Sequence, residues 1–338
     1  MTTPPRHRPN LRRLLIAATA ALGGAVMLPA GSFAQAPAAF PDKPIRVIVG
    51  FPAGVATDSV ARLLAQRLTQ VKGWNVVVEN RPGVSGSLAA AEVVRATPNG
   101  YTLLLSAAGP MVTNPNLYKT VSYDATRDFT PISLVANISY VVTVAANSPA
   151  KSLDELVALA RARPGELNYG SFGVGSTQHL IATTVLTRAG VSMKHVPYKG
   201  SMDLMAGAVS GDVAFYVDTA VATTQQVVAG RLRQLGVTSA HRIGTLPDLP
   251  TLDQLGMKGF DMPNWLMLLG PAGLPAPIAE MLTREVNALV RSDDLRDRLV
   301  KLGADPRGDL GPADLAAFLR TEGVKWKQAL EASGARAE

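Results

Sequence analysis

The chain has 338 residues, of which 47% are hydrophobic, and 33 Lys and Arg against 26 Asp and Glu give a formal net charge of +7. It has no cysteine, which excludes a disulfide framework and thiolate chemistry. No block of Lys and Arg marks a nucleic-acid-binding face. Since no group of His, Asp and Glu has the spacing of metal ligands, we expect neither a metal nor a cofactor.

The N-terminus has the pattern of a secretory signal peptide. Four arginines precede the apolar residues 14–28, and Ala34 and Ala36 supply small residues for a cleavage site. The apolar run is shorter than the roughly 20 residues of a membrane-spanning helix, although an uncleaved anchor is the alternative. We therefore expect export to the periplasm with cleavage near Ala36. Removing the four arginines leaves 29 basic against 26 acidic residues, a net charge of +3.

Short β-rich runs then alternate with helical patterns, which predicts a mainly parallel sheet flanked by helices. The expected strands of this first set are residues 45–49, 76–78 and 101–105, with helices at 58–69 and 87–95. Two apolar runs follow, at 132–136 and 140–145. We interpret them as strands that cross to a second lobe.

A second set of the same kind begins with a helix at 153–163, for which Ser152 and Glu155 form a capping box. Further strands are expected at 168–170, 194–198, 213–217, 235–238 and 265–269, and helices at 176–189, 202–209, 277–291, 294–302 and 312–333. The order predicts an α/β protein whose chain enters one lobe, builds a second and returns to the first. The expected parts are 1–36 (signal peptide), 37–142 (lobe 1), 143–261 (lobe 2) and 262–338 (the return to lobe 1 and C-terminal helices).

The first loop of chemical interest is residues 51–58, FPAGVATD. It joins a strand to a helix at the carboxyl end of the sheet, where α/β proteins place ligands. Amides at a helix N-terminus attract anions, and the small residues Ala53 and Gly54 let a ligand approach the backbone. The alternative is an ordinary turn capped by Thr57 or Asp58.

The second loop of interest is residues 170–177, GSFGVGST. It also follows a strand and opens a helix, and Ser171, Ser176 and Thr177 add hydroxyls to its glycines. Such a loop suits a carboxylate or a phosphate, although its spacing matches neither a Walker A loop nor a dinucleotide fingerprint. Two such loops, one in each set, predict that facing helix N-termini hold one dicarboxylate from both sides.

An enzyme is the competing interpretation. Ser176 and His179 are three residues apart on one helix, and Asp218 is the acid that could complete a hydrolase or isomerase site. No G-x-S-x-G motif accompanies them. We therefore interpret His179 as a polar residue at the rim of the cleft, and Tyr198 as a candidate cleft wall.

Seven short segments occur in order along the chain: FPDKPIR at 40–46, FPAG at 51–54, VENRPG at 78–83, PNGYTLL at 98–104, DFTPI at 128–132, HVPYKG at 195–200 and LPDLPT at 246–251. Together they resemble the Bug-type receptors of the tripartite tricarboxylate transporter family. The resemblance implies a two-lobed periplasmic-binding-protein fold with a hinge. It also implies a monomeric, non-enzymatic receptor that delivers a small carboxylate to integral-membrane transporter subunits. The alternative is a sensor partner of a signalling system.

Carried over by position, the resemblance places the ligand between the two loops. With the neighbouring candidates, the expected ligand-binding residues are Phe51, Ala53, Gly54, Val55, Thr57, Asp58, Ser106, Ser171, Gly173, Gly175, Ser176, Thr177, His179, Tyr198 and Asp218. Val55 stands where the family usually has a second glycine, and valine does not easily adopt a positive φ. We therefore expect Val55 to alter the path of the first loop or the ligand. The sequence Val84-Ser85-Gly86 departs mildly from the Ala-Gly-Gly that the family favours.

Overall fold

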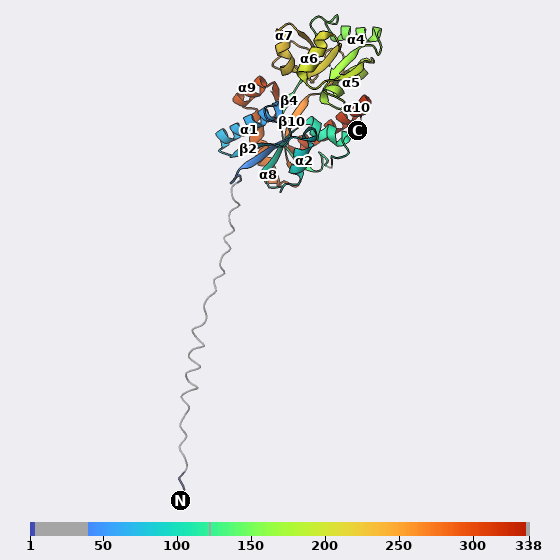
Figure 1. Ribbon diagram of the computed structural model, residues 1–338. Coiled ribbons are helices and arrows are strands. Elements are labelled where there is room, and N and C mark those ends of the chain that lie inside the picture. The colour runs from blue at the N-terminus through green and yellow to red at the C-terminus, as the bar shows by residue number, and fades with distance from the viewer. Residues whose placement is uncertain (4–39, 122, 336–338) are drawn as a thin grey trace. The chain divides into compact units, whose positions relative to one another are not determined.

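Two β-sheets, each flanked by helices, organise the chain (Figure 1). The computed structural model describes residues 1–3, 40–121 and 123–335, so the predicted cleavage site and nearly all of the signal peptide lie outside the described residues. The described residues from 41 to 335 form one compact unit. We call the part built on the six-stranded sheet lobe 1 and the part built on the five-stranded sheet lobe 2. Within the described residues, no helix is both long and apolar enough to cross a membrane.

Lobe 1 contains the sheet with strand order β11-β4-β10-β3-β1-β2. Its strands are β1 (Ile45–Val49), β2 (Val76–Asn80), β3 (Thr102–Ala107), β4 (Phe129–Ile138), β10 (Asn264–Pro271) and β11 (Ala304–Pro306). Its helices are α1 (Ala56–Lys72), α2 (Ser87–Val94), α3 (Asn114–Leu117), α8 (Ala276–Val290), α9 (Asp293–Lys301) and α10 (Pro312–Ser333), with a short 3-10 turn η1 (Val84–Gly86) and a π-helical turn η2 (Gly109–Thr113).

Lobe 2 contains the sheet with strand order β7-β6-β8-β5-β9. Its strands are β5 (Tyr140–Ala145), β6 (Asn168–Ser171), β7 (Lys194–Pro197), β8 (Phe215–Thr219) and β9 (Leu232–Val237). Its helices are α4 (Leu153–Ala162), α5 (Thr177–Ala189), α6 (Ser201–Ser210) and α7 (Ala220–Val228).

The two-lobed α/β architecture is confirmed, but each sheet is mixed rather than mainly parallel. β1 pairs in parallel with β2 and β3, and β6 with β7 and β8, as β-α-β crossovers require. The strands that carry the chain between the lobes run the other way: β10 is antiparallel to β3 and β4, and β5 to β8 and β9. A strand that returns from the other lobe enters its sheet from the opposite end, which reverses its direction.

Two segments of the chain cross between the lobes and are hydrogen-bonded to each other. The first is the junction of β4 and β5 at Ser139, and the second follows β9. The hydroxyls of Ser139 and Ser239 are 3.1 Å apart, and the Thr238 amide donates to the carbonyl of Tyr140 at 3.0 Å. These contacts align the two crossing segments as a hinge would require.

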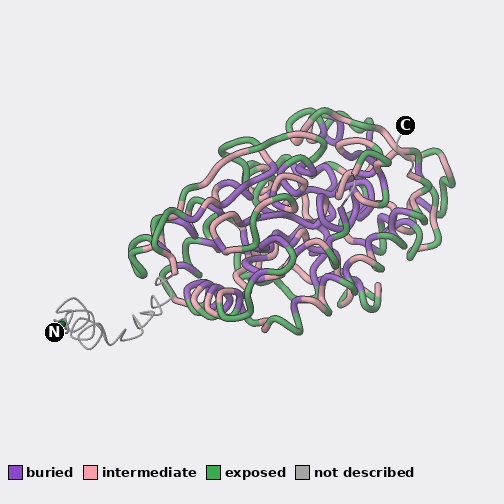
Figure 2. The backbone as a smooth tube through the Cα atoms, turned by 90° about the horizontal axis from the view of Figure 1, so that it is seen from below, coloured by how far each residue is buried: buried purple, intermediate pink, exposed green. Residues whose placement is uncertain are grey.

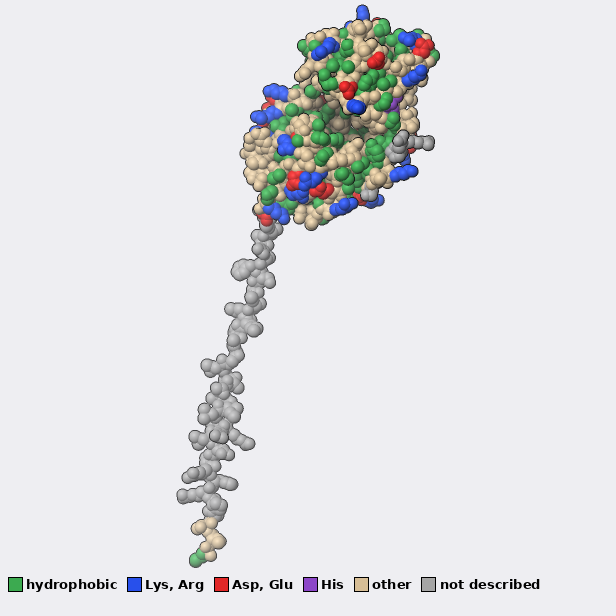
Figure 3. Space-filling model, in the orientation of Figure 1, with side chains coloured by type: hydrophobic (Ala, Val, Ile, Leu, Met, Phe, Trp, Pro, Cys, Tyr) green, Lys and Arg blue, Asp and Glu red, His purple; other side chains and the backbone are tan. Residues whose placement is uncertain are grey.

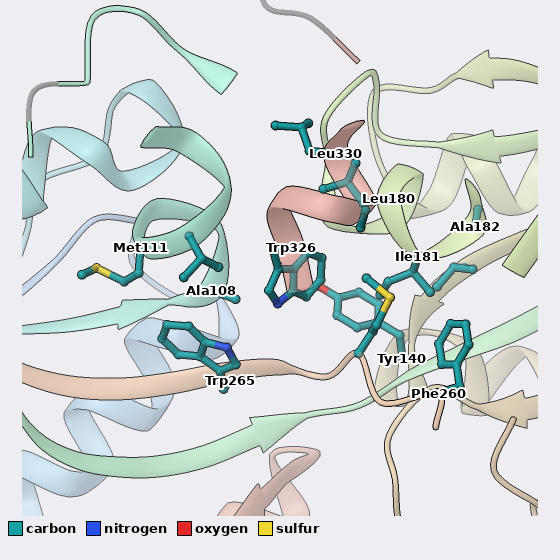
Figure 4. Packing of buried hydrophobic residues seen from close by; sticks show 14 of the residues in the cluster. Ala108, Met111, Tyr140, Leu180, Ile181, Ala182, Phe260, Trp265, Trp326 and Leu330 are labelled. Carbon is teal, nitrogen blue, oxygen red and sulfur yellow. The ribbon is translucent and has the colours of Figure 1, made fainter. Parts of the chain in front are cut away.

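The C-terminal helix α10 packs against both lobes. It contacts β4 and η2 in lobe 1 and α5 in lobe 2. Trp326 belongs to the same buried cluster as Leu180 and Trp265 (Figure 4). In Figure 2 the buried backbone runs through the interior, and exposed segments lie around it. The indole nitrogens of Trp265 and Trp326 donate to one carboxylate oxygen of the buried Glu322, at 2.8 and 2.9 Å. The two lobes therefore share a continuous core on this side.

Candidate functional site

A cavity of about 400 Å³ lies between the lobes, a size typical of small-molecule sites. Figure 3 shows the surface hollowed where the lobes meet. No charged side chain is among the described residues that line the cavity. Lobe 1 contributes Phe51, Ser85, Ala107, Gly109, Pro110, Thr113, Asn114 and Tyr118; the crossing strands contribute Tyr140 and Asn264; lobe 2 contributes Phe172, Val174, Gly175, Ser176, Thr177 and Gln178.

The second loop contributes most of the lobe 2 wall, and two of its glycine amides are hydrogen-bonded within lobe 2. The Gly173 amide donates to the Ser171 hydroxyl at 3.1 Å, and the Gly175 amide donates to Nδ1 of His179 at 3.3 Å. The first two amides of α5, those of Thr177 and Gln178, have no acceptor within the helix. Because both residues line the cavity, the anion-attracting end of α5 faces the cavity.

Two histidines lie beneath this loop. The rings of His179 and His195 are 4.4 Å apart, and His179 is only 4% exposed. Burial lowers the pKa of His179 to about 4, with a further contribution from His195, so the ring is neutral at physiological pH. Nε2 of His195 is 2.7 Å from the Ser171 hydroxyl. His179 is therefore buried as a support of the loop, whereas the sequence pattern indicated the rim of the cleft.

The residues of the competing enzyme interpretation do not form a catalytic arrangement. The Ser176 hydroxyl caps α5 by accepting from the backbone amide of His179 at 3.2 Å. Among the described residues, no hydrogen bond joins it to the His179 ring. Asp218 is buried and accepts from the hydroxyl of Ser201 at 2.5 Å and the amide of Thr219 at 2.7 Å. Its carboxylate, whose pKa is raised by burial, is thus engaged within lobe 2.

The first loop is mostly outside the cavity. Only Phe51 lines it; Ala53, Gly54 and Val55 are exposed. The buried Asp58 accepts from the Gly54 amide (2.8 Å), and Arg62 and Asn80 also donate to its carboxylate. Burial raises the pKa of Asp58, but these hydrogen bonds outweigh it and lower the pKa overall. The carboxylate therefore fixes the loop by hydrogen bonds on the side away from solvent, beside the buried Thr57.

Val55 fits the first loop without strain. Its backbone is extended, with φ −77° and ψ 165°, and the positive φ of 87° falls on Gly54. The side chain is 40% exposed. The valine at this position therefore needs no positive φ.

Ser106 and Tyr198 lie near the site but do not line the cavity. Ser106 is buried within β3, opposite Met267 of β10, while its neighbour Ala107 reaches the cavity. Tyr198 packs closely against α6, because a Cβ added at Gly207 of that helix would lie 2.2 Å from the Tyr198 hydroxyl.

Several lining residues were missed because they belong to segments without a recognised loop motif. Asn114 follows β3, and Tyr140 and Asn264 begin the crossing strands. Asn264 accepts from the Ala108 amide at 3.2 Å, which fixes the start of η2.

Burial raises the pKa of Tyr140, as does the charge of Asp218, whereas hydrogen bonding with Thr177 and Asn264 opposes the shift. The sequence signal that could have found part of this wall is Gly109-Pro110 and Asn114, which follow the carboxyl end of β3.

The part of the chain that the structure describes contains no group of three or more His, Asp or Glu that could hold a metal ion. What lies between the lobes is a neutral cavity lined by hydroxyl, amide and apolar groups, with a helix N-terminus at one wall. Two α/β lobes joined by two crossing segments around such a cavity define a solute-binding receptor.

The chain belongs to the tripartite tricarboxylate transporter receptor family, whose model matches residues 60–335. It is 31% identical to the protein BugT of Bordetella pertussis over 97% of this chain and 99% of that one.

Two solved structures are similar over most of the chain. The Rhodopseudomonas palustris protein Rpa4515, solved with adipate, is 34% identical, with a TM-score of 0.75 over 88% of this chain and 100% of that one. MatC of the same organism, solved with bound malate, is 28% identical, with a TM-score of 0.70 over 86% of this chain and 100% of that one.

Proposed function

We propose that the protein is a periplasmic receptor that captures a small carboxylate in the cavity between its lobes. The observation that carries this proposal is the wall formed by Ser176, Thr177 and Gln178, where hydroxyls and the first amides of α5 meet the cavity. Relatives of the same fold hold adipate and malate, which are both dicarboxylates. The net charge of the mature chain is small, so local dipoles rather than bulk charge attract the anion.

Membership of the family supports a partner and a location for the receptor. We propose delivery of the acid to integral-membrane transporter subunits by a monomeric receptor whose lobes close around the ligand. The lobe boundaries we propose are near residues 142 and 261, beside the two crossing segments. The family membership and the predicted export signal both support a periplasmic location. We also propose that the site binds its ligand without turnover, because the Ser176 hydroxyl serves as a helix cap.

The test is thermal unfolding with a panel of mono-, di- and tricarboxylates. An acid that binds only the native state raises Tm increasingly with its concentration. A response to neutral sugars and to no acid would overturn the proposal.

A matched pair of variants locates the site. Thr177→Val removes a hydroxyl from the cavity wall with little change of shape, and it should weaken binding about fivefold, the value of one hydrogen bond. Thr187→Val makes the same change on an exposed turn of the same helix and should leave binding unchanged. Equal affinities for the two variants would place the acid elsewhere.

A further inference from the structure

The turn after β2 holds two non-glycine residues in the left-handed backbone region. Val84 has φ 44° and Ser85 has φ 50°, between Gly83 and Gly86, whose φ angles are also positive. For a residue branched at Cβ, such as valine, a positive φ is a genuine outlier. Strain of this kind persists only where the surrounding structure holds it, and it concentrates at functional sites.

The surroundings hold this turn from two sides. Asn114 is 4% exposed, and its amide nitrogen donates to the carbonyls of Val84 (3.3 Å) and Ser85 (3.1 Å) and to the Ser87 hydroxyl (2.9 Å). On the other side the turn contacts the end of β1, because a Cβ added at Gly50 would lie 2.7 Å from the Cα of Gly86. The strained conformation is therefore built into lobe 1.

The two strained residues differ in whether they line the cavity. Ser85 lines the cavity, on the wall of lobe 1, whereas Thr177 and Gln178 belong to the wall of lobe 2. Val84 is 44% exposed and is not among the lining residues. Glycine would adopt the same backbone conformation without strain. What serine adds at position 85, on the cavity wall, is a hydroxyl, which can both donate and accept a hydrogen bond.

On the basis of the proposed function, we propose that Ser85 is a specificity-determining residue that hydrogen-bonds the end of the ligand remote from α5. An acid whose carboxylate lies against α5 must extend across the cavity to reach Ser85. A polar group at its second end then gains a hydrogen bond to Ser85. The cavity lining has no charged side chain, so this discrimination rests on hydrogen bonds. The receptor therefore favours dicarboxylates over monocarboxylates of the same chain length.

The experiment uses three variants of the mature protein: Ser85→Gly, Ser85→Ala and the control Val84→Gly. Calorimetry measures the affinity for succinate, glutarate and adipate, each beside the monocarboxylate of equal length (butanoate, pentanoate, hexanoate), and thermal unfolding gives Tm without ligand. Ser85→Gly should raise Tm by about 2 °C, because it relieves strain. It should nevertheless bind the preferred dicarboxylate about fivefold more weakly, with monocarboxylate binding unchanged.

Ser85→Ala should weaken the same dicarboxylate to the same extent without the gain in Tm. Val84→Gly should raise Tm and leave every affinity within about twofold, because its side chain is outside the cavity. Wild-type affinity for dicarboxylates in both Ser85 variants would overturn this inference while the proposed function stands. Failure of the wild-type protein to bind any acid would overturn both.

Discussion

The two β-α loops occupy equivalent places in the two lobes but are held in different ways. The first, residues 51–58, is fixed by the carboxylate of Asp58, on which Gly54, Arg62 and Asn80 converge, and most of it is exposed. The second, residues 170–177, is fixed by the neutral rings and hydroxyls beneath it, and it forms a wall of the cavity. The first amides of α5, which have no acceptor within the helix, can thus attract an anion without a competing charge beneath the loop.

The largest effect is expected at the point where the second loop touches the other lobe. Gly175 has φ 77°, and an added Cβ would lie 2.5 Å from Cδ2 of Leu117 in lobe 1. Gly175→Val should lower the free energy of unfolding by about 3 kcal/mol in urea titrations, from backbone strain and overpacking. Gly173→Val is the control: its φ is 111°, but nothing lies within 4 Å of an added Cβ. It should cost about 1–2 kcal/mol, and equal losses would show that the contact with Leu117 is unimportant.

The support beneath the second loop should be sensitive to pH. His179 has its pKa lowered to about 4 in the folded state, so between about pH 6.5 and 4 the unfolded chain binds a proton that the folded protein does not. Its contribution is therefore complete above pH 6.5 and is lost as the pH falls, on the order of 2–3 kcal/mol in the free energy of unfolding.

His179→Asn tests this expectation, because its side-chain oxygen can replace Nδ1 as the acceptor for Gly175. The decline between pH 6.5 and 4 should be smaller in the variant than in the wild type. Parallel pH profiles of the two proteins would assign the decline to other groups.

The support of the first loop should depend on charge. Asp58→Asn should destabilise the protein by about 1–2 kcal/mol at neutral pH, because the amide cannot accept all the donors that converge on the carboxylate. Since the pKa of Asp58 is lowered by folding, its stabilisation is present at neutral pH and disappears as the pH falls through the acid range. Asp203→Asn, an exposed aspartate in the first turn of α6, is the control and should be nearly neutral.

The smallest effect is expected at Val55. Its backbone is extended and its side chain does not line the cavity, so Val55→Gly should cost at most about 0.5 kcal/mol, through the entropy of the unfolded chain. The ranking of bound acids should stay the same in calorimetry. A changed ranking would show that the first loop reaches the ligand after all.

Local patterns in the sequence predicted the local structure well. Ser152 accepts from the Glu155 amide at 3.1 Å, as a capping box requires, although the Glu155 carboxylate reaches back to the Lys151 amide rather than to that of Ser152. Ser176 caps α5. The direction of β10 and β5 was not predicted, because strand pairing between distant segments leaves no periodicity in the sequence. The very short elements α3 and β11 were missed for a related reason, since a few residues cannot display a period.

The cavity lining was predicted only in part. The second loop was recognised from its glycines and hydroxyls, and five of its residues, Phe172 and Val174 to Thr177, line the cavity. Which amides face the ligand depends on acceptors supplied by tertiary contacts, such as Nδ1 of His179 for Gly175. Asn264 and Ser85 line the cavity from parts of the chain that are far apart in sequence, so no local pattern predicts that they meet.

The pairing of Trp265 and Trp326 on Glu322 gives the protein a built-in optical reporter. The chain has three tryptophans, and these two are buried around one carboxylate, on the helix that packs against both lobes. Indole emission responds to the polarity and charge beside the ring. A rearrangement of the lobes that shifts α10 should therefore register as a change in intrinsic fluorescence, without any attached dye.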